Sequence, residues 1–153
     1  MLSSIGILFI TLTTLLSLIV IYKSLADIKI QKNYINSSIF KLTTLQTTFS
    51  ILSFLVLIIG FVLSDFSLIN VYENSHTLKP IFYKIAGAWG SHEGSLLLWI
   101  NILVLFSFLF LVFTKHENKH YILYTLIFQN FLILGFLFFL LFNWIPFSPI
   151  YPV

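Results

Sequence analysis

Four long apolar segments, separated by polar stretches, dominate the pattern of hydrophobic and polar positions. They cover approximately residues 4–22, 47–63, 95–113 and 121–143. Each reaches or approaches the ~20 apolar residues that a helix needs to cross ~30 Å of hydrocarbon. None alternates polar and apolar residues as a membrane strand does, and a spanning helix satisfies its own backbone hydrogen bonds. The pattern therefore predicts an all-α integral membrane protein with about four transmembrane helices.

The composition excludes a protein that folds in water. Of the 153 residues, 59% are hydrophobic and only 8% are charged, and the mean hydropathy is +1.02. A soluble domain carries roughly 25% charged residues, so this chain has too little polar surface to cover a globule. We expect residues 1–153 to form a single membrane domain that contacts lipid, with no nucleic-acid partner. The chain has no cysteine, so it offers no thiolate or disulfide chemistry.

The first apolar segment shares its position with secretory signal peptides. However, it lacks a basic start and a small-x-small cleavage site, and its apolar run is too long. We therefore expect residues 4–22 to be retained as a membrane anchor.

The lysines predict the orientation of the chain. Six of the eight lie in the loop 23–46 or in the link between the third and fourth spans, and two lie in the loop 64–94. Because inner loops carry an excess of basic residues, both termini and the loop 64–94 are expected on the outer side. The six are Lys23, Lys29, Lys32, Lys41, Lys115 and Lys119, and the two are Lys79 and Lys84.

The outer loop 64–94 contains a segment suited to the membrane surface. Pro80 precedes I-F-Y-K-I-A-G-A-W, in which apolar and aromatic residues cover much of the surface. Such aromatic residues anchor segments at the headgroup level, so we expect an interfacial segment. Gly87, Gly90 and Gly94 weaken it as an isolated helix and suggest close approach to a neighbouring helix, a partner or a flat ligand.

The outer loop and the start of the third span carry a specific motif. The runs S-D-F-S-L-I-N-V-Y-E-N-S (64–75) and L-K-P-I-F-Y-K-I-A-G-A-W-G-S-H-E-G-S-L-L-L-W (78–99) closely resemble the N-terminal part of the CcmF family. The string W-G-S-H-E-G-S-L-L-L-W (89–99) is the most specific part of this resemblance. The ending N-W-I-P-F-S-P-I-Y-P resembles the family more loosely and lacks its arginine.

The resemblance implies a component of the cytochrome c maturation haem lyase, a holocytochrome c synthase. In that family, haem from a haem chaperone is attached through thioether bonds to the C-x-x-C-H motif of apocytochrome c. The Trp-rich segment that presents haem, and the histidines that ligate it, belong to a part of the family with no match here. The resemblance therefore implies that haem b is held by the complete assembly and is not ligated by this chain alone. No residue of this chain is expected to be catalytic or to bind a metal.

The resemblance also implies that the remaining CcmF-like fragment or fragments, with the Trp-rich segment, assemble with this chain. It indicates a piece of a split mitochondrial CcmF or a truncated form, and hence the mitochondrial inner membrane or, alternatively, a bacterial inner membrane. General c-type cytochromes and nitrite-reductase cytochromes are both compatible substrates. An accessory structural subunit of a respiratory complex, without a haem role, is the alternative, but it leaves residues 89–99 unexplained.

Within this motif, the candidates for handling or docking haem are Trp89, His92, Glu93 and Trp99. His92 either ligates haem iron or makes structural hydrogen bonds, and the family's ligands lie elsewhere, which favours the second interpretation. Glu93 either accepts a proton or complements the dipole at the start of the third span, where we expect Ser95 to be the N-cap.

Helical spacing groups several of these candidates. If residues 92–99 are helical, His92, Ser95, Leu96 and Trp99 share one face. That face is either a wall for a ligand or a seam for helix packing. We favour the seam, because small and polar residues commonly mark such seams in membranes.

Further polar residues are expected to be structural or solvated. His76, His116 and His120 lie in loops, and the i, i+4 pair in the inner link is too small a set for a metal site. Asn101 and Asn130 are expected to serve helix packing, with Asn130 bonded to a neighbouring helix, and Gly135 is expected to allow close approach. No ionisable residue lies deep in a span, which argues against an ion pathway carried by this chain.

Overall fold

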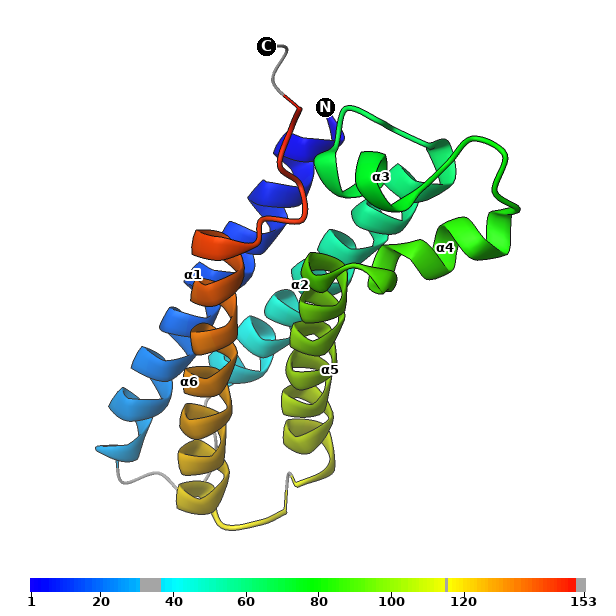
Figure 1. The fold of residues 1–153 in the computed structure, drawn as a ribbon. Helices are drawn as coiled ribbons and strands as arrows, with labels where there is room; N and C mark the ends of the chain where they lie inside the picture. The colour runs from blue at the N-terminus through cyan, green and yellow to red at the C-terminus, as the bar shows by residue number, and fades with distance from the viewer. Residues whose placement is uncertain (31–36, 115, 151–153) are drawn as a thin grey trace.

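The computed structural model describes residues 1–30, 37–114 and 116–150. Four long helices run side by side, and two short helices, α3 and α4, lie at one end of the bundle (Figure 1). The described residues contain one isolated β-bridge and no strand. The helices in chain order are α1 (Leu2–Ile28), α2 (Ser37–Leu63), α3 (Ile69–Asn74), α4 (Ile81–Gly90), α5 (His92–Phe113) and α6 (Lys119–Asn143).

The four long helices are each long and apolar enough to cross a membrane. The predicted all-α membrane fold with four spans is therefore confirmed. The start of α1, the short helices and the segment after α6 lie at one end of the bundle, which we call the outer end; the α1–α2 and α5–α6 connections lie at the other, inner end (Figure 1). Lys32 and Lys115, used to predict the orientation, lie outside the described residues.

Helices α1 and α2 extend further towards the inner end than the apolar segments predicted. Helix α1 ends at Ile28 rather than near residue 22, and α2 begins at Ser37 rather than near residue 47. Gln46, expected at the end of a loop, is instead a fully buried residue of α2. The first turns of α2 are rich in Ser, Thr and Gln, which lowers their hydropathy. Their hydroxyls are satisfied within the helix, as when Thr43 Oγ1 donates to Ile39 O at 3.0 Å.

A polar contact joins three helices near the middle of the bundle. Gln46 Nε2 of α2 donates to Ser17 Oγ of α1 at 2.7 Å and to Asn130 Oδ1 of α6 at 2.9 Å. All three side chains are fully buried. Asn130 thus bonds to a neighbouring helix of the same chain, whereas Asn101 Nδ2 donates to Leu97 O within its own helix at 2.9 Å.

Two apolar clusters fill the bundle on either side of this polar contact. The larger lies in the outer half and draws on α1, α2, α4, α5, α6 and the segment after α6, with Leu57, Phe61 and Phe147 among its fully buried members. The smaller lies in the inner half and comprises Ile39, Leu111, Ile122, Leu123 and Leu126. The core is therefore divided into two apolar layers with a polar contact between them.

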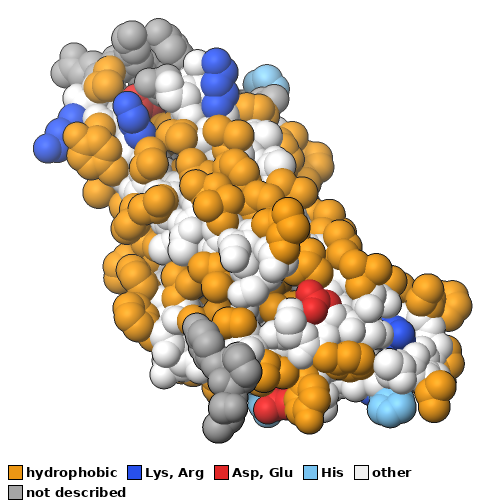
Figure 2. All heavy atoms as spheres, turned by 90° about the horizontal axis from the view of Figure 1, so that it is seen from above, with side chains coloured by type: hydrophobic (Ala, Val, Ile, Leu, Met, Phe, Trp, Pro, Cys, Tyr) orange, Lys and Arg blue, Asp and Glu red, His pale blue; other side chains and the backbone are white. Residues whose placement is uncertain are grey.

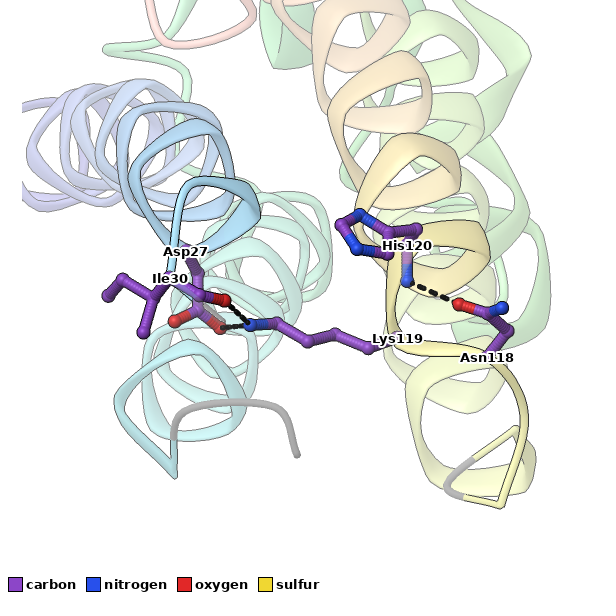
Figure 3. Close-up of polar contacts among 5 residues, drawn as sticks. All are labelled: Asp27, Ile30, Asn118, Lys119 and His120. Carbon is purple, nitrogen blue, oxygen red and sulfur yellow. Dashed lines mark hydrogen bonds and ion pairs between the residues drawn. The ribbon is translucent and has the colours of Figure 1, made fainter. Parts of the chain in front are cut away.

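A buried ion pair connects α1 to α6 at the inner end (Figure 3). Lys119 Nζ lies 3.8 Å from Asp27 Oδ2, and it donates to Ile30 O at 3.0 Å. Asn118 Oδ1 accepts from His120 N at 2.9 Å and so caps α6. We expected Lys119 to belong to a solvated link, and this is wrong, because only 6% of its surface is exposed. His116 and His120 are exposed.

Candidate functional site

The motif of residues 89–99 forms the junction of α4 and α5 at the outer end. Ser91 separates the two helices and is the N-cap of α5, with Ser91 Oγ accepting from Gly94 N at 3.0 Å. Glu93 lies in the first turn, where a carboxylate complements the helix dipole. The predicted N-cap, Ser95, is wrong: it lies inside α5, and its hydroxyl donates to His92 O at 3.0 Å. The helix begins at His92, within the polar string and four residues before the apolar run that starts at Leu96.

Two of the three predicted glycine contacts hold this junction together. A Cβ at Gly94 would overlap the carbonyl oxygen of Ala88, so α4 and α5 touch through their backbones. A Cβ at Gly87 would lie 3.0 Å from the Phe61 ring of α2. Gly90, by contrast, has no described residue within 4 Å of its Cβ position, so it makes no close approach to a neighbouring helix of the described residues.

Helix α4 lies at the outer end of the bundle, crosswise to the long helices (Figure 1), and one of its faces is apolar and exposed. Ile81, Phe82 and Trp89 on this face are exposed, whereas Ala88 is fully buried against the bundle. Lys84 Nζ donates to Ser64 Oγ at 2.6 Å and ties α4 to the end of α2. Seen from above, apolar side chains cover most of the middle of the molecule, and the charged side chains lie mainly towards its two ends (Figure 2).

The four candidate side chains all lie at this junction, but they do not form one wall. Trp89 is 43% and Trp99 51% exposed, and neither ring stacks on another in the part of the chain that the structure describes. His92 is exposed, and Glu93 is half-buried. The His92 ring stacks instead on Trp144 of the segment after α6, with ring centroids 5.5 Å apart and planes 25° apart.

Trp144, the residue directly after α6, also belongs to this aromatic surface. It also meets Phe139 edge to face, with ring centroids 5.1 Å apart. A tryptophan directly after a span is typical of an interfacial anchor, and the pairing of Trp144 with His92 was not predicted. Both residues lie at the outer ends of neighbouring spans, and hence at a similar depth in the membrane. This was the signal from which their contact could have been predicted.

The predicted α5 face of His92, Ser95, Leu96 and Trp99 points away from the bundle. His92, Ser95 and Trp99 are exposed, while Leu97, Ile100 and Val104 pack in the core. Within the described residues this face is used only in part, because Leu96 packs against the core and the His92 ring stacks on Trp144. Its exposed part remains available to a ligand, to lipid or to another polypeptide.

An apolar groove adjoins this face between α5 and α6. It has a volume of about 520 Å³ and is lined by Leu96 of α5 and by five residues of α6. Gly135 was expected to allow the close approach of a helix from this chain or another subunit, and no described residue lies within 4 Å of its Cβ position. The α6 residues of the groove are Phe131, Leu132, Gly135, Phe136 and Phe139.

The segment after α6 is fastened to the outer end by contacts that the sequence did not predict. Phe147 is fully buried against Gly6 of α1, where a Cβ would overlap its ring. Ser3 Oγ donates to Phe147 O at 2.6 Å, and Pro149 forms a β-bridge with Leu68 of the outer loop. The aromatic surface around His92 and Trp144 is thereby fixed relative to α1.

The described residues do not assemble a metal site. No group of three or more His, Asp or Glu side chains in residues 1–30, 37–114 and 116–150 is placed to hold a metal ion. His76 is exposed, and its Nδ1 accepts from Leu78 N at 3.3 Å. Among the described histidines, His92 is the one whose ring stacks on an aromatic ring, that of Trp144.

Comparison with known proteins gives matches to cytochrome c-type biogenesis proteins. The chain is 46% identical over 100 residues to CycK of Rhizobium meliloti. These aligned residues make up 65% of this chain and 15% of CycK. It is 38% identical over 100 residues to CcmF of Escherichia coli, covering 65% and 16%. It is 36% identical over 109 residues to NrfE of Haemophilus influenzae, covering 71% and 17%. The match spans about a sixth of the length of these relatives. No family model and no solved structure matches the chain.

Proposed function

We propose that this chain, which is homologous to part of the CcmF, CycK and NrfE proteins, serves in cytochrome c maturation as one component of a larger CcmF-like membrane assembly. The 46% identity to CycK over 100 residues is the observation that carries the proposal, and it agrees with the family resemblance of residues 64–99. The fold is compatible with it, because four spans present the motif at one end of a membrane bundle.

In this proposal the assembly is a haem lyase, and the chain supplies an outer wall rather than the reacting groups. Haem b is bound by the complete assembly, which receives it from a haem chaperone and transfers it to apocytochrome c. The Trp-rich segment and the ligand histidines come from the remaining CcmF-like fragment or fragments. The supporting geometry is the outward face of Trp99 and His92, with the His92 ring held flat against Trp144. Aromatic rings of this kind suit an extended apolar ring system.

The proposed location is an inner membrane, with residues 64–94 facing the intermembrane space or the periplasm. Lys23, Lys29 and Lys119 lie at the inner end and support this orientation. The relatives named above are bacterial, and a mitochondrial origin is part of the proposal.

The proposal is tested by replacing His92. In cells that depend on this chain, His92→Ala should lower the yield of holocytochrome c, measured by haem staining of membrane fractions. His116→Ala is the matched control, because His116 is also exposed but lies at the inner end. Normal holocytochrome c after removal of the whole chain would refute the function. Normal yield in both variants would reduce the motif to a packing element.

A further inference from the structure

We infer that the groove between α5 and α6 receives a transmembrane helix from the remaining part of the CcmF-like assembly. The inference rests on the proposed function, since it requires that a larger assembly exists. It goes beyond that function by naming the surface on which the chains meet. The groove is lined by Leu96 and by α6 residues between Phe131 and Phe139.

The spacing along α6 fits a crossing helix. Phe131, Gly135 and Phe139 follow one another at intervals of four residues and so form a single row on the helix surface. The two phenylalanines are eight residues apart, about 12 Å along the axis, which is close to the ~10 Å diameter of a helix. The open position at Gly135 lies midway between them. A membrane helix that packs at a crossing angle of about 20–40° can therefore approach the α6 backbone most closely at Gly135, with one ring on either side of the crossing point along the axis.

Among the described residues, Gly135 makes no contact that accounts for it. Nothing lies within 4 Å of its Cβ position, and glycine weakens a helix interior while gaining nothing from lipid. In membranes, small residues mark the points where two helix backbones approach closely. The glycine therefore indicates a second helix rather than acyl chains.

The exposed faces of the bundle differ in a way that is compatible with a protein partner. The exposed apolar residues in the middle of α1 and α2 are leucines and isoleucines, such as Leu15, Leu55 and Ile59. On α6 the exposed row is aromatic, and Phe131, in the middle of the helix, is 73% exposed. Phenylalanine is favourable in the centre of a bilayer, and aromatic residues are also enriched in the centre of protein interfaces. The phenylalanine row of α6 is therefore compatible with a protein partner, and Gly135 is the feature that favours one.

The relatives supply a source for the occupant. The matched region covers only 15–17% of the length of CycK, CcmF and NrfE, so much of a CcmF-like assembly lies outside the matched stretch. His92 and Ser95 lie within about one helical turn of Leu96 on α5, and both are exposed. They offer hydrogen bonds that a helix end can use and an acyl chain cannot.

Photo-crosslinking in native membranes tests the inference directly. A benzophenone amino acid at Phe131 or Phe139 should crosslink to a protein that mass spectrometry identifies as homologous to the remaining part of CcmF. The same probe at Leu55 or Ile59 is the matched control and should label lipid. Crosslinks to lipid alone at Phe131 and Phe139, or to a second copy of this chain, would overturn the inference.

A second variant distinguishes loss of docking from loss of folding. Gly135→Leu places a side chain in open space, so the chain should still accumulate in the membrane. We expect the copurifying partner to fall at least tenfold, with no change for Leu55→Phe on α2. Unchanged recovery of the partner with Gly135→Leu would refute the groove as the docking site. The proposed function has its own test, the yield of holocytochrome c after removal of the chain. The docking site and the proposed function can therefore be refuted independently.

Discussion

The outer and inner halves of the bundle differ in how their helices are joined. In the outer half, backbones and rings meet at glycines, with Gly94 against Ala88 and Gly6 against Phe147. In the inner half, α1 and α6 are joined by the buried pair of Asp27 and Lys119. Close contacts at glycines distinguish the end that carries the motif, whereas a buried ion pair, beside a small apolar cluster, distinguishes the opposite end. The motif end is therefore the half in which a small added volume should do most damage.

The largest effect is expected from Gly94→Ala. The new Cβ would overlap the carbonyl oxygen of Ala88, a backbone atom that cannot rotate away. We expect a loss of more than about 3 kcal/mol in the free energy of unfolding, as overpacking at a backbone contact predicts. An SDS titration followed by circular dichroism measures it. Gly90→Ala is the control, because its Cβ position is open, and it should leave stability unchanged. Equal stability of the two variants would contradict the close contact of α4 and α5.

The next largest effect is expected from Lys119→Met at the inner end. This change leaves the Asp27 carboxylate buried without its cation, and breaking a buried pair in this way costs about 3 kcal/mol. The same SDS titration measures the loss. Lys23→Met, at an exposed lysine of α1, is the matched control and should change little. A similar small effect of both variants would show that the inner end does not depend on charge.

The same division explains what the sequence could predict. Four spans follow from local hydropathy, because ~20 consecutive apolar residues have few alternatives to a membrane helix. The position of Asn130 in a span already implied a need for a hydrogen-bond partner. Its partner, Gln46, was missed because the polar start of α2 has the hydropathy of a loop.

Contacts between distant residues were the part that the sequence could not predict. The pairing of Asp27 with Lys119 and the stacking of His92 on Trp144 depend on which helices lie side by side. Neither periodicity nor composition carries that information for a single sequence. The N-cap at Ser91 was missed for a local reason, since two serines flank H-E-G and the apolar run begins only after the second.

A smaller effect is expected from Asn130→Leu, at the boundary between the two halves. The change removes the hydrogen bond from Gln46 Nε2, which still bonds to Ser17. Interhelical hydrogen bonds in membranes contribute about 0.6 to 2 kcal/mol, so we expect a loss of about 1 kcal/mol. Asn101→Leu is the matched control, because Asn101 donates only within its own helix, and it should cost less. A larger loss for Asn101→Leu than for Asn130→Leu would contradict a polar contact that joins the halves.

The smallest effect is expected from Gln129→Leu, one residue before Asn130. Gln129 Oε1 is buried and accepts no hydrogen bond from the described residues. Replacing an unsatisfied buried acceptor removes a desolvation penalty, so stability in the isolated chain should be unchanged or slightly higher. SDS titrations of the isolated chain and of the native assembly compare the two states. A loss that occurs only in the assembly would show that a partner helix donates to Gln129. A loss of 1 kcal/mol or more in the isolated chain, an order of magnitude typical of a lost hydrogen bond, would contradict the unpaired acceptor.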